Sequence, residues 1–311
     1  MPKVSVIIPT YNRAKFLSLA LASVLNQTFQ DFEIIIVDDN SQDNTQEFVT
    51  DFDDKRIKYI RHETNKGVAA SRNTGVISSD GEYIAFLDDD DEWLPHKLEV
   101  QVDLLEKSSS IIGAVYSGAF KVESSNGNVL AQHTPKKRGD VFNEMIVGNC
   151  AGPTSTLLLR RECFEKVGLF DVNIGFGEDY DMWLRISQGY HFDYIEEPLV
   201  RYSIQNNGLS NNYEIRLKGA EALLSKHEQL YETNRKNYSY RYFSIGVLYC
   251  YNGNIKRGRE IFFKAVKLYP FEIRYYYNLC LSLLGVKAFK KFKEIRDKIP
   301  KMAACSCNMK L

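Results

Sequence analysis

Short apolar runs alternate with amphipathic helical patterns at the start of the chain, and this alternation limits the folds that the sequence can adopt. Apolar runs that end at turn residues predict strands, and apolar residues spaced by three and four predict helices. Strands are expected at Val4–Ile8, Phe32–Val37, Ile57–Ile60 and Tyr83–Leu87. Helices are expected at Ala14–Leu25, at Thr45–Phe52 and, after Gly67, within Lys66–Ile77. We therefore predict an α/β fold with a Rossmann-like, mostly parallel sheet and flanking helices.

Polar clusters follow three of these strands. They are Pro9–Asn12, Asp38–Ser41 and Asp88–Asp91. In open α/β sheets, ligands bind beyond the carboxyl ends of the strands. A single acidic loop at such a place is ordinary turn or helix-cap chemistry. Two acidic loops on neighbouring strands favour a ligand site.

The run Asp88–Asp91 places four carboxylates side by side, and their charges repel one another unless something compensates them. Carboxylate oxygens suit Mg²⁺ or Mn²⁺, and Mg²⁺ usually takes one or two of them together with substrate phosphates. The run therefore predicts a metal that bridges the protein to a diphosphate. The alternative is a solvated turn that caps the helix expected at Pro95. The sequence has no G-x-x-x-x-G-K-[ST] loop, and no G-x-G-x-x-G follows the first strand.

Composition excludes several classes of protein. The chain has 311 residues, 44% of them hydrophobic and 26% charged, which is typical of a packed globular protein. Its formal net charge is zero, so we expect no nucleic-acid partner. The six cysteines are irregularly spaced, which predicts free thiols in place of a zinc site or a disulfide framework. We expect a cytoplasmic protein, because no targeting segment is apparent before the first strand pattern.

Five segments resemble successive motifs of family 2 glycosyltransferases with the GT-A fold. They are "VSVIIPTYNR" (Val4–Arg13), "VDDNSQDNT" (Val37–Thr45), "NKGVAASRNTG" (Asn65–Gly75), "YIAFLDDDDEW" (Tyr83–Trp93) and "GEDYDMWLRI" (Gly177–Ile186). The motifs occur in the family's order, which is more specific than any one of them. The resemblance implies that a sugar passes from a nucleotide-diphosphate donor to an acceptor hydroxyl, with inversion at the anomeric carbon.

The resemblance also implies a binding role for particular residues. Pro9 and Tyr11 match positions that line the nucleotide base. Asp39 matches the carboxylate that accepts a hydrogen bond from uracil, which favours a UDP-sugar donor. Arg72 matches a basic residue near the nucleotide, and its alternative is an ordinary ion pair on a helix surface.

Within the acidic run, Asp88 and Asp90 match the first and last members of the family's D-x-D motif. Asp90 is expected to bind Mg²⁺ or Mn²⁺ directly. Asp88 and Asp89 are expected to face the ribose and metal-bound water, and Asp88 is the second candidate metal ligand. Asp91 is expected to cap the following helix.

The same resemblance assigns the catalytic base to Asp179, with Glu178 as the reserve candidate. A carboxylate on the acceptor side is needed to take the hydroxyl proton as the nucleophile attacks. Asp181 is expected to pair with Arg185, four residues later on a helix. The alternative for Glu178 and Asp179 is a purely electrostatic role at a helix N-terminus.

The sequence departs from the family where a clamp on the leaving diphosphate is expected. Family members often carry an Arg and a His shortly after a Tyr, but this chain reads Tyr202-Ser203-Ile204-Gln205. Arg201, Asn206 and Asn207 are candidates to replace the missing Arg and His, and the sequence does not decide among them. The Asn-, Gly- and Ser-rich segment Gln205–Asn212 predicts a mobile lid or a linker.

The remaining sequence predicts a second domain. We expect a GT-A domain over 1–210 and a helical region over 211–311, with a tetratricopeptide-like helix pair at about 239–272. An ordinary helical hairpin is the alternative for that pair. Residues 286–301 combine an excess of Lys and Arg with an apolar face of Val286, Phe289, Phe292 and Ile295. This predicts peripheral contact with anionic lipid, and the alternative is a solvated terminal helix.

Our leading hypothesis is a metal-dependent, inverting glycosyltransferase of surface polysaccharide, lipopolysaccharide or glycoconjugate biosynthesis. Its acceptor would be a glycan or a lipid-linked sugar, and the protein would contact the inner face of the cell membrane peripherally. A nucleotidyltransferase that makes the sugar nucleotide is the competing enzyme, but it would need a Gly-rich basic loop after the first strand. A non-catalytic adaptor that binds a protein partner through the terminal helices is the other alternative.

Overall fold

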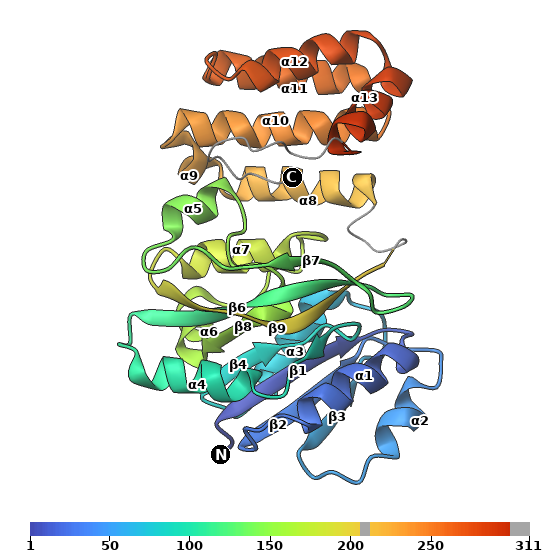
Figure 1. Cartoon of the computed structure of the whole chain (residues 1–311), viewed down its shortest axis with the longest axis vertical. Coiled ribbons are helices and arrows are strands. Elements are labelled where there is room, and N and C mark those ends of the chain that lie inside the picture. Colours follow the sequence, from blue (N-terminus) through green and yellow to red (C-terminus); the bar gives the residue numbers. More distant parts are fainter. Residues whose placement is uncertain (206–211, 299–311) are drawn as a thin grey trace. The chain divides into compact units, whose positions relative to one another are not determined.

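The computed structural model describes the backbone of residues 1–205 and 212–298 (Figure 1). The chain divides into two compact units, Met1–Gly208 and Leu209–Leu311. The first unit combines a sheet with helices. In the second unit, the described part is made of helices.

One mixed sheet organises the first unit. Its strands are β1 (Val4–Thr10), β2 (Phe32–Asp38), β3 (Ile57–Arg61), β4 (Tyr83–Phe86), β5 (Glu92–Trp93), β6 (Ile112–Glu123), β7 (Val129–His133), β8 (Leu157–Arg160) and β9 (His191–Ile204). Their order is β3-β2-β1-β4-β8-β6-β9-β5, and β7 pairs with β6. Parallel ladders join β3, β2, β1 and β4, and also β6 and β9. The strand β8 is antiparallel to both neighbours.

The predicted alternation of strands and helices is confirmed. The helices of this unit are α1 (Ala14–Leu25), α2 (Thr45–Thr50), α3 (Val68–Ile77), α4 (Lys97–Lys107), α5 (Phe142–Val147), α6 (Arg161–Val167) and α7 (Glu178–Ile186). The predicted and observed ends differ by a few residues. The helix α3 begins at Val68, directly after Gly67 as expected, and the N–H groups of Lys66 and Gly67 donate to the carboxylate of Asp39.

The strand order places a crevice at the end of β1. Strand β1 lies between β2 and β4, so the order of strands along the sheet reverses at β1: β2 and β3 lie on one side of it, and β4 lies on the other. Thr10 is in register with Asp38, and Ile7 is in register with Phe86 at the end of β4. The loops that follow β1, β2 and β4 therefore meet at one edge of the sheet, where ligands bind in folds of this kind.

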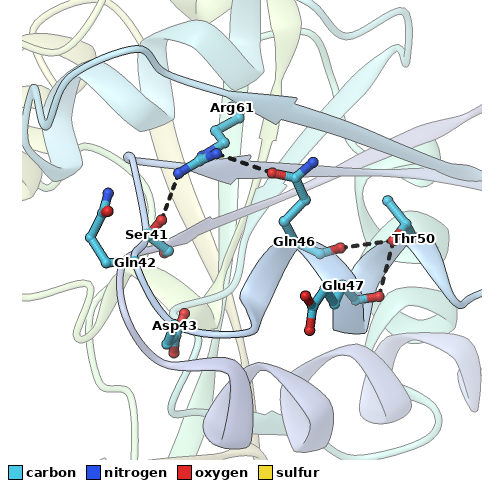
Figure 2. A pocket seen from close by; sticks show the side chains of 7 residues that line it. All are labelled: Ser41, Gln42, Asp43, Gln46, Glu47, Thr50 and Arg61. Atoms are coloured by element: carbon cyan, nitrogen blue, oxygen red, sulfur yellow. Dashed lines mark hydrogen bonds between the residues drawn. The ribbon is translucent and has the colours of Figure 1, made fainter.

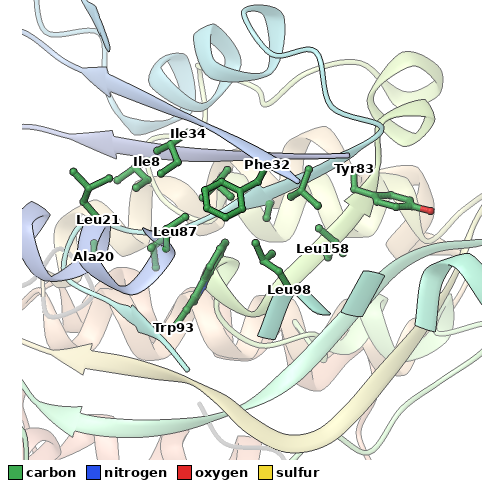
Figure 3. Packing of buried hydrophobic residues seen from close by; sticks show 14 of the residues in the cluster. Ile8, Ala20, Leu21, Phe32, Ile34, Tyr83, Leu87, Trp93, Leu98 and Leu158 are labelled. Carbon is green, nitrogen blue, oxygen red and sulfur yellow. The ribbon is translucent and has the colours of Figure 1, made fainter. Parts of the chain in front are cut away.

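Two apolar layers hold this edge in place. Val6, Ile8 and Ile34 point to one face of the sheet and pack with Leu21 of α1 and Leu98 of α4 (Figure 3). The alternate residues point to the other face, because side chains alternate along a strand.

On that second face, an aromatic cluster lies between β4 and the helices α6 and α7. The ring centroid of Phe86 is 5.3 Å from that of Phe170 and 6.0 Å from that of Phe164. Trp183 of α7 packs edge-on against Phe170 at 6.2 Å. The helix α7 is thus fixed against the strand that ends at the acidic run.

The described part of the second unit consists of α8 (Tyr213–Lys226), α9 (Glu228–Glu232), α10 (Arg235–Tyr251), α11 (Ile255–Leu268), α12 (Ile273–Leu283) and α13 (Val286–Lys298). Asparagine side chains cap three of these helices and accept hydrogen bonds from their first-turn N–H groups: Asn212, Asn234 and Asn254. The core contains stacked or tilted rings of Phe243, Phe262, Tyr275 and Phe289.

The position of Phe289 corrects one expectation. The apolar face of residues 286–301 was expected to face lipid. Of its residues, Phe289 is fully buried among helices of its own unit, whereas Phe292 is 47% exposed. The Phe289 ring packs 6.0 Å from Tyr251 and 6.4 Å from Phe262. Residues 299–301 lie outside the described part of the chain. None of the helices described is long and apolar enough to cross a bilayer.

Candidate active site

The acidic run follows β4, and two arginine side chains offset part of its charge. Arg72 Nη2 lies 2.8 Å from Asp88 Oδ1. Arg13 Nη1 lies 3.1 Å from both Asp89 Oδ1 and Asp90 Oδ2. The protein thus supplies two guanidinium groups of its own against four carboxylates, which offsets part of the repulsion without an external ion.

Asp91 does not cap a helix. It is fully buried, and it accepts hydrogen bonds from Ser155 Oγ (2.6 Å) and from the N–H of Ser203 on β9 (2.9 Å). Ser155 Oγ also accepts from the N–H of Asp88 (3.1 Å), and Trp93 Nε1 donates to the Ser155 carbonyl (2.9 Å). The run is therefore anchored to its surroundings, and the alternative of a solvated turn is wrong.

Burial changes the acidity of the run. It raises the pKa of Asp89 to about 7, against the opposing effect of Arg13. Burial and then the charge of Asp88 raise the pKa of Asp90. These carboxylates lie in a poorly solvated place, where a further positive charge would bind favourably.

Arg72 joins the acidic run to the pair on α7. It is buried on α3, and its Nη1 lies 2.7 Å from Glu178 Oε1 while its Nη2 contacts Asp88. Its guanidinium group also lies 5.7 Å from the centre of the Phe170 ring. The alternative of an ion pair on a helix surface is wrong. Arg72 fixes the distance between the two acidic segments instead.

Glu178 and Asp179 differ in their contacts, although they are neighbours in sequence. Glu178 forms an ion pair with Arg72, whereas the Asp179 carboxylate accepts a hydrogen bond from the N–H of Tyr180 (2.7 Å). Burial and the charge of Glu178 raise the pKa of Asp179 to about 6. Glu178 and Asp179 therefore differ in their environment, since the ion pair with Arg72 is made by Glu178.

The remaining helix contacts support this position. Arg185 Nε lies 3.0 Å from Asp181 Oδ2, as the i, i+4 spacing predicts. Tyr180 donates a hydrogen bond from its hydroxyl to the carbonyl of Met145 on α5 (2.6 Å). The helix α7 is therefore tied to α5 through Tyr180, and the acidic pair occupies its first turn.

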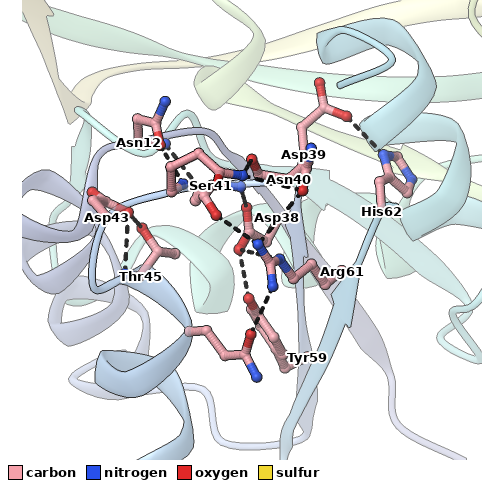
Figure 4. Close-up of polar contacts among 12 residues, drawn as sticks. Asn12, Asp38, Asp39, Asn40, Ser41, Asp43, Thr45, Tyr59, Arg61 and His62 are labelled. Carbon is pink, nitrogen blue, oxygen red and sulfur yellow. Dashed lines mark hydrogen bonds and ion pairs between the residues drawn. The ribbon is translucent and has the colours of Figure 1, made fainter. Parts of the chain in front are cut away.

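Asp39 shapes the loop before α3. Its carboxylate accepts hydrogen bonds from the N–H groups of Lys66 (2.8 Å) and Gly67 (2.7 Å), and His62 Nδ1 lies 2.8 Å away (Figure 4). An ionised carboxylate offers about four lone-pair positions, so one remains for a ligand. Sequence reasoning missed His62, although it follows directly on β3, the fourth strand end at this edge.

The loops after β1 and β2 are bound to each other. The N–H of Asn12 donates to Ser41 Oγ (2.8 Å), and the N–H of Gln42 donates to Asn12 Oδ1 (2.6 Å). Pro9 lies buried within β1, whereas Tyr11 is 45% exposed at the edge. The Tyr11 ring is thus accessible for stacking against a planar ligand.

Arg201, a candidate to replace the missing Arg and His of the diphosphate clamp, has its contacts elsewhere. Arg201 donates to the Gly127 carbonyl (3.0 Å) and lies 3.8 Å from Glu92, so its contacts are with segments outside the acidic run. Gln205 Nε2 donates to Asp90 Oδ2 (2.6 Å). Asn206 and Asn207 lie outside the described residues. Sequence reasoning missed Gln205 and Arg13, although both stand in segments that it quoted.

The acidic run fits a divalent ion of the predicted kind. Within residues 1–205 and 212–298, no group of three or more His, Cys, Asp or Glu side chains is arranged to hold an ion alone. Mg²⁺ needs no such cage where substrate phosphates complete its coordination. Asp88 and Asp90 offer hard oxygen atoms, and Arg13 already places a positive charge against Asp90.

A separate hollow of about 380 Å³ lies beside α2 (Figure 2). Its lining residues are Ser41, Gln42, Asp43, Gln46, Glu47, Thr50 and Arg61. Arg61 crosses it and donates to the Ser41 carbonyl (2.7 Å) and to Gln46 Oε1 (3.1 Å). Ser41 belongs to the polar cluster after β2, but the lining includes none of the residues expected to bind the donor, hold a metal or act as the base.

The fold and this edge together define an α/β protein with polar and acidic side chains gathered at the carboxyl ends of its parallel strands, and comparison with known proteins is more specific. Residues 5–168 match the family model "Glycosyl transferase family 2". The chain is 33% identical over 211 residues to the Escherichia coli UDP-Glc:alpha-D-GlcNAc-diphosphoundecaprenol beta-1,3-glucosyltransferase WfgD. That match covers 67% of this chain and 80% of the relative.

Solved structures share the fold. S. aureus TarS 1–349 in complex with UDP-GlcNAc matches with a TM-score of 0.65 at 18% identity, over 95% of this chain and 92% of that one. The mannosyltransferase PcManGT from Pyrobaculum calidifontis, in complex with GDP-Man and Mn²⁺, matches with a TM-score of 0.58 at 17% identity, over 96% and 88%.

The chain belongs to glycosyl transferase family 2. It is a glycosyltransferase that uses a nucleotide-sugar donor, and its first unit has the GT-A fold. The family membership removes the nucleotidyltransferase and adaptor alternatives for the first unit.

Proposed function

We propose that the chain transfers a sugar from a UDP-linked donor to a hydroxyl of a lipid-linked glycan, with inversion of the anomeric carbon. One observation carries this proposal. Arg72 holds the acidic run after β4 and the acidic pair of α7 at one edge of the sheet, through contacts of 2.8 and 2.7 Å. A donor-binding segment and a candidate base therefore face one site.

In the proposed reaction, Asp179 accepts the proton of the acceptor hydroxyl while its oxygen attacks the anomeric carbon. The bond from that carbon to the diphosphate oxygen breaks, and the diphosphate keeps the electron pair. Arg72 neutralises Glu178, so Asp179 is the freer carboxylate. With a pKa raised to about 6, Asp179 is largely ionised at pH 7 and is more basic than an ordinary aspartate.

Asp90 and Asp88 are the proposed ligands of Mg²⁺ or Mn²⁺, which would offset the charge of the diphosphate when bound. Arg13 contacts Asp89 and Asp90 and is placed to add a second positive charge at this position. The complex of PcManGT with Mn²⁺ and a nucleotide sugar supports the use of a divalent ion.

Asp39, Pro9 and Tyr11 are proposed to bind the base and ribose of the donor. Asp39 retains a lone-pair position for the imide N–H of uracil. Tyr11 is exposed in the loop after β1, the strand that neighbours the one before Asp39. Uridine donors are named for both WfgD and TarS, which supports UDP. The undecaprenol diphosphate acceptor named for WfgD supports a lipid-linked acceptor in surface glycan assembly.

A donor screen tests this proposal. UDP-, GDP- and dTDP-sugars are incubated with Mn²⁺ and a short-chain GlcNAc-diphospholipid, and proton NMR reads the anomeric configuration of the product. A product of opposite configuration from a UDP-sugar is the expected result. A product that retains the donor configuration would contradict inversion, and turnover with GDP- or dTDP-sugars alone would contradict the uridine assignment.

A further inference from the structure

The helix α12 presents an apolar face to solvent. Ile273, Tyr277 and Leu284 follow one another at helical spacing, with Tyr276 and Leu283 beside them, and all five side chains are exposed. The opposite face, with Tyr275, Asn278, Leu281 and Ser282, is buried against the unit. We call the five exposed residues the α12 stripe. A soluble surface helix normally places its polar residues on the exposed side, so the α12 stripe departs from the usual pattern in the way that interaction sites do.

The position of α12 strengthens this reading. It lies at one end of the stack formed by α10, α11 and α12 (Figure 1). Terminal helices of stacked helical arrays usually carry a polar outer face, because no further helix covers them. Phe271, just before α12, is 84% exposed and extends the apolar surface.

Charge is separated between the two units. Residues 209–311 contain 20 Lys and Arg against 8 Asp and Glu, whereas residues 1–208 contain 20 against 32. The net charge of zero thus conceals an excess of twelve positive charges on the helical unit. Lys287, Lys290 and Lys291 stand on α13, which packs against α12.

We propose that the helical unit docks on a membrane surface rich in anionic lipid, with the α12 stripe inserted at the headgroup level. Apolar side chains next to lysines are the combination that binds such an interface. Tyr276 and Tyr277 suit it further, since tyrosine favours the boundary between water and lipid.

Other occupants fit these observations less well. A second copy joined through the same stripe would bring two units of large positive charge together, which opposes the contact. An acidic protein surface would attract the lysines, but it would leave the α12 stripe without an apolar partner. An anionic bilayer satisfies both the charge and the apolar face.

Vesicle flotation of the full chain tests this inference. Vesicles of phosphatidylcholine mixed with phosphatidylglycerol should retain the protein, and pure phosphatidylcholine should retain much less. Retention should fall as salt is raised, because screening weakens attraction to the charged surface. This measurement is independent of the donor and of transfer, so a failure here leaves the proposed function untouched.

Variants then separate the contributions. Ile273→Glu combined with Leu284→Glu should lower partitioning about tenfold or more, because two exposed apolar side chains lose their contact with lipid. Ile77→Glu on α3 is the matched control, since Ile77 is 72% exposed and Ile273 is 79% exposed, and it should leave partitioning unchanged. Circular dichroism confirms that each variant is folded. Replacing Lys287, Lys290 and Lys291 by Gln should weaken retention similarly.

Several outcomes overturn the inference. One is equal retention by neutral and anionic vesicles, and another is unchanged retention of the folded Ile273→Glu/Leu284→Glu variant. A third is that the parent chain binds no vesicles and sediments as a dimer, while the Ile273→Glu/Leu284→Glu variant sediments as a monomer. That result would assign the α12 stripe to self-association.

Discussion

Arg72 shows how much the site depends on one buried side chain. Its guanidinium group is the positive partner of both Asp88 and Glu178. Arg72→Gln would leave two largely buried carboxylates without that partner, so we expect a loss of about 3–5 kcal/mol in unfolding free energy. We also expect weaker donor binding. Urea unfolding and calorimetry measure the two effects.

Lys107→Gln is the control for that experiment. Lys107 forms an ion pair with Asp103, but both side chains are largely exposed, so the change should stay within about 1 kcal/mol. If Arg72→Gln behaves like Lys107→Gln, the bridge does not hold the two acidic segments together.

Asp179 gives the pH dependence of transfer. The base must be ionised, and its pKa is raised to about 6, so the rate should fall as the pH drops below about 6. Asp179→Asn should lower kcat at least about 10²-fold while donor affinity stays unchanged. A kcat profile from pH 5 to 8 and nucleotide titration check this prediction. Lost nucleotide affinity in Asp179→Asn would contradict its assignment as the base.

Sequence reasoning reached the carboxylates of the site but not their partners. Asp88, Asp90 and Asp179 stand in motifs that order and spacing reveal. Arg13, His62 and Gln205 act through contacts across 23 to 115 residues of sequence, which no local pattern encodes. The two arginine partners of the acidic run could not be predicted for the same reason.

At the scale of elements, the close packing of α3 on β1 positions Arg72. A Cβ added to Gly75 would lie 2.3 Å from Ile7 Cγ2, and Ile7 is fully buried. Gly75→Ala should therefore destabilise the protein by about 1–3 kcal/mol, as overpacking does. Denaturant unfolding measures the loss.

Gly189→Ala is the matched control. An added Cβ at Gly189 would lie 3.5 Å from Lys166 Nζ, an ordinary contact with a flexible side chain. Its effect should stay within about 0.5 kcal/mol. Equal effects at the two glycines would mean that α3 can move away from β1 at little cost.

The parallel half of the sheet follows from sequence because its strands are short, buried on both faces and separated by periodic helices. The half of the sheet that contains β6 and β9 is harder to predict from sequence patterns. Strands β6 and β9 are 12 and 14 residues long, with register shifts along their ladder and partly exposed stretches. Such strands lack both a continuous apolar run and a regular alternation.

At the scale of the whole molecule, the two compact units should respond to ligand separately. Calorimetric unfolding should show two transitions, and UDP with Mn²⁺ should raise the temperature of one of them while leaving the other unchanged, because the proposed donor site belongs to residues 1–208. A single transition that shifts as a whole would show that the units unfold together.

The separation of charge between the units is also a property of the whole molecule. The net charge of zero gave the expectation of no nucleic-acid partner, but it conceals that residues 209–311 are strongly basic. Net charge averages over units that can bind different partners. Charge is therefore better counted for each unit once its limits are known.

Calorimetry of nucleotide binding is the most direct test of the proposed site. UDP is titrated into the parent chain and into Asp90→Asn, with and without Mn²⁺. We predict binding that requires Mn²⁺ and that weakens at least about tenfold in Asp90→Asn, because the variant loses a carboxylate ligand. Binding of equal strength without Mn²⁺, or an unchanged affinity in Asp90→Asn, would contradict a nucleotide diphosphate held through a divalent ion at the acidic run.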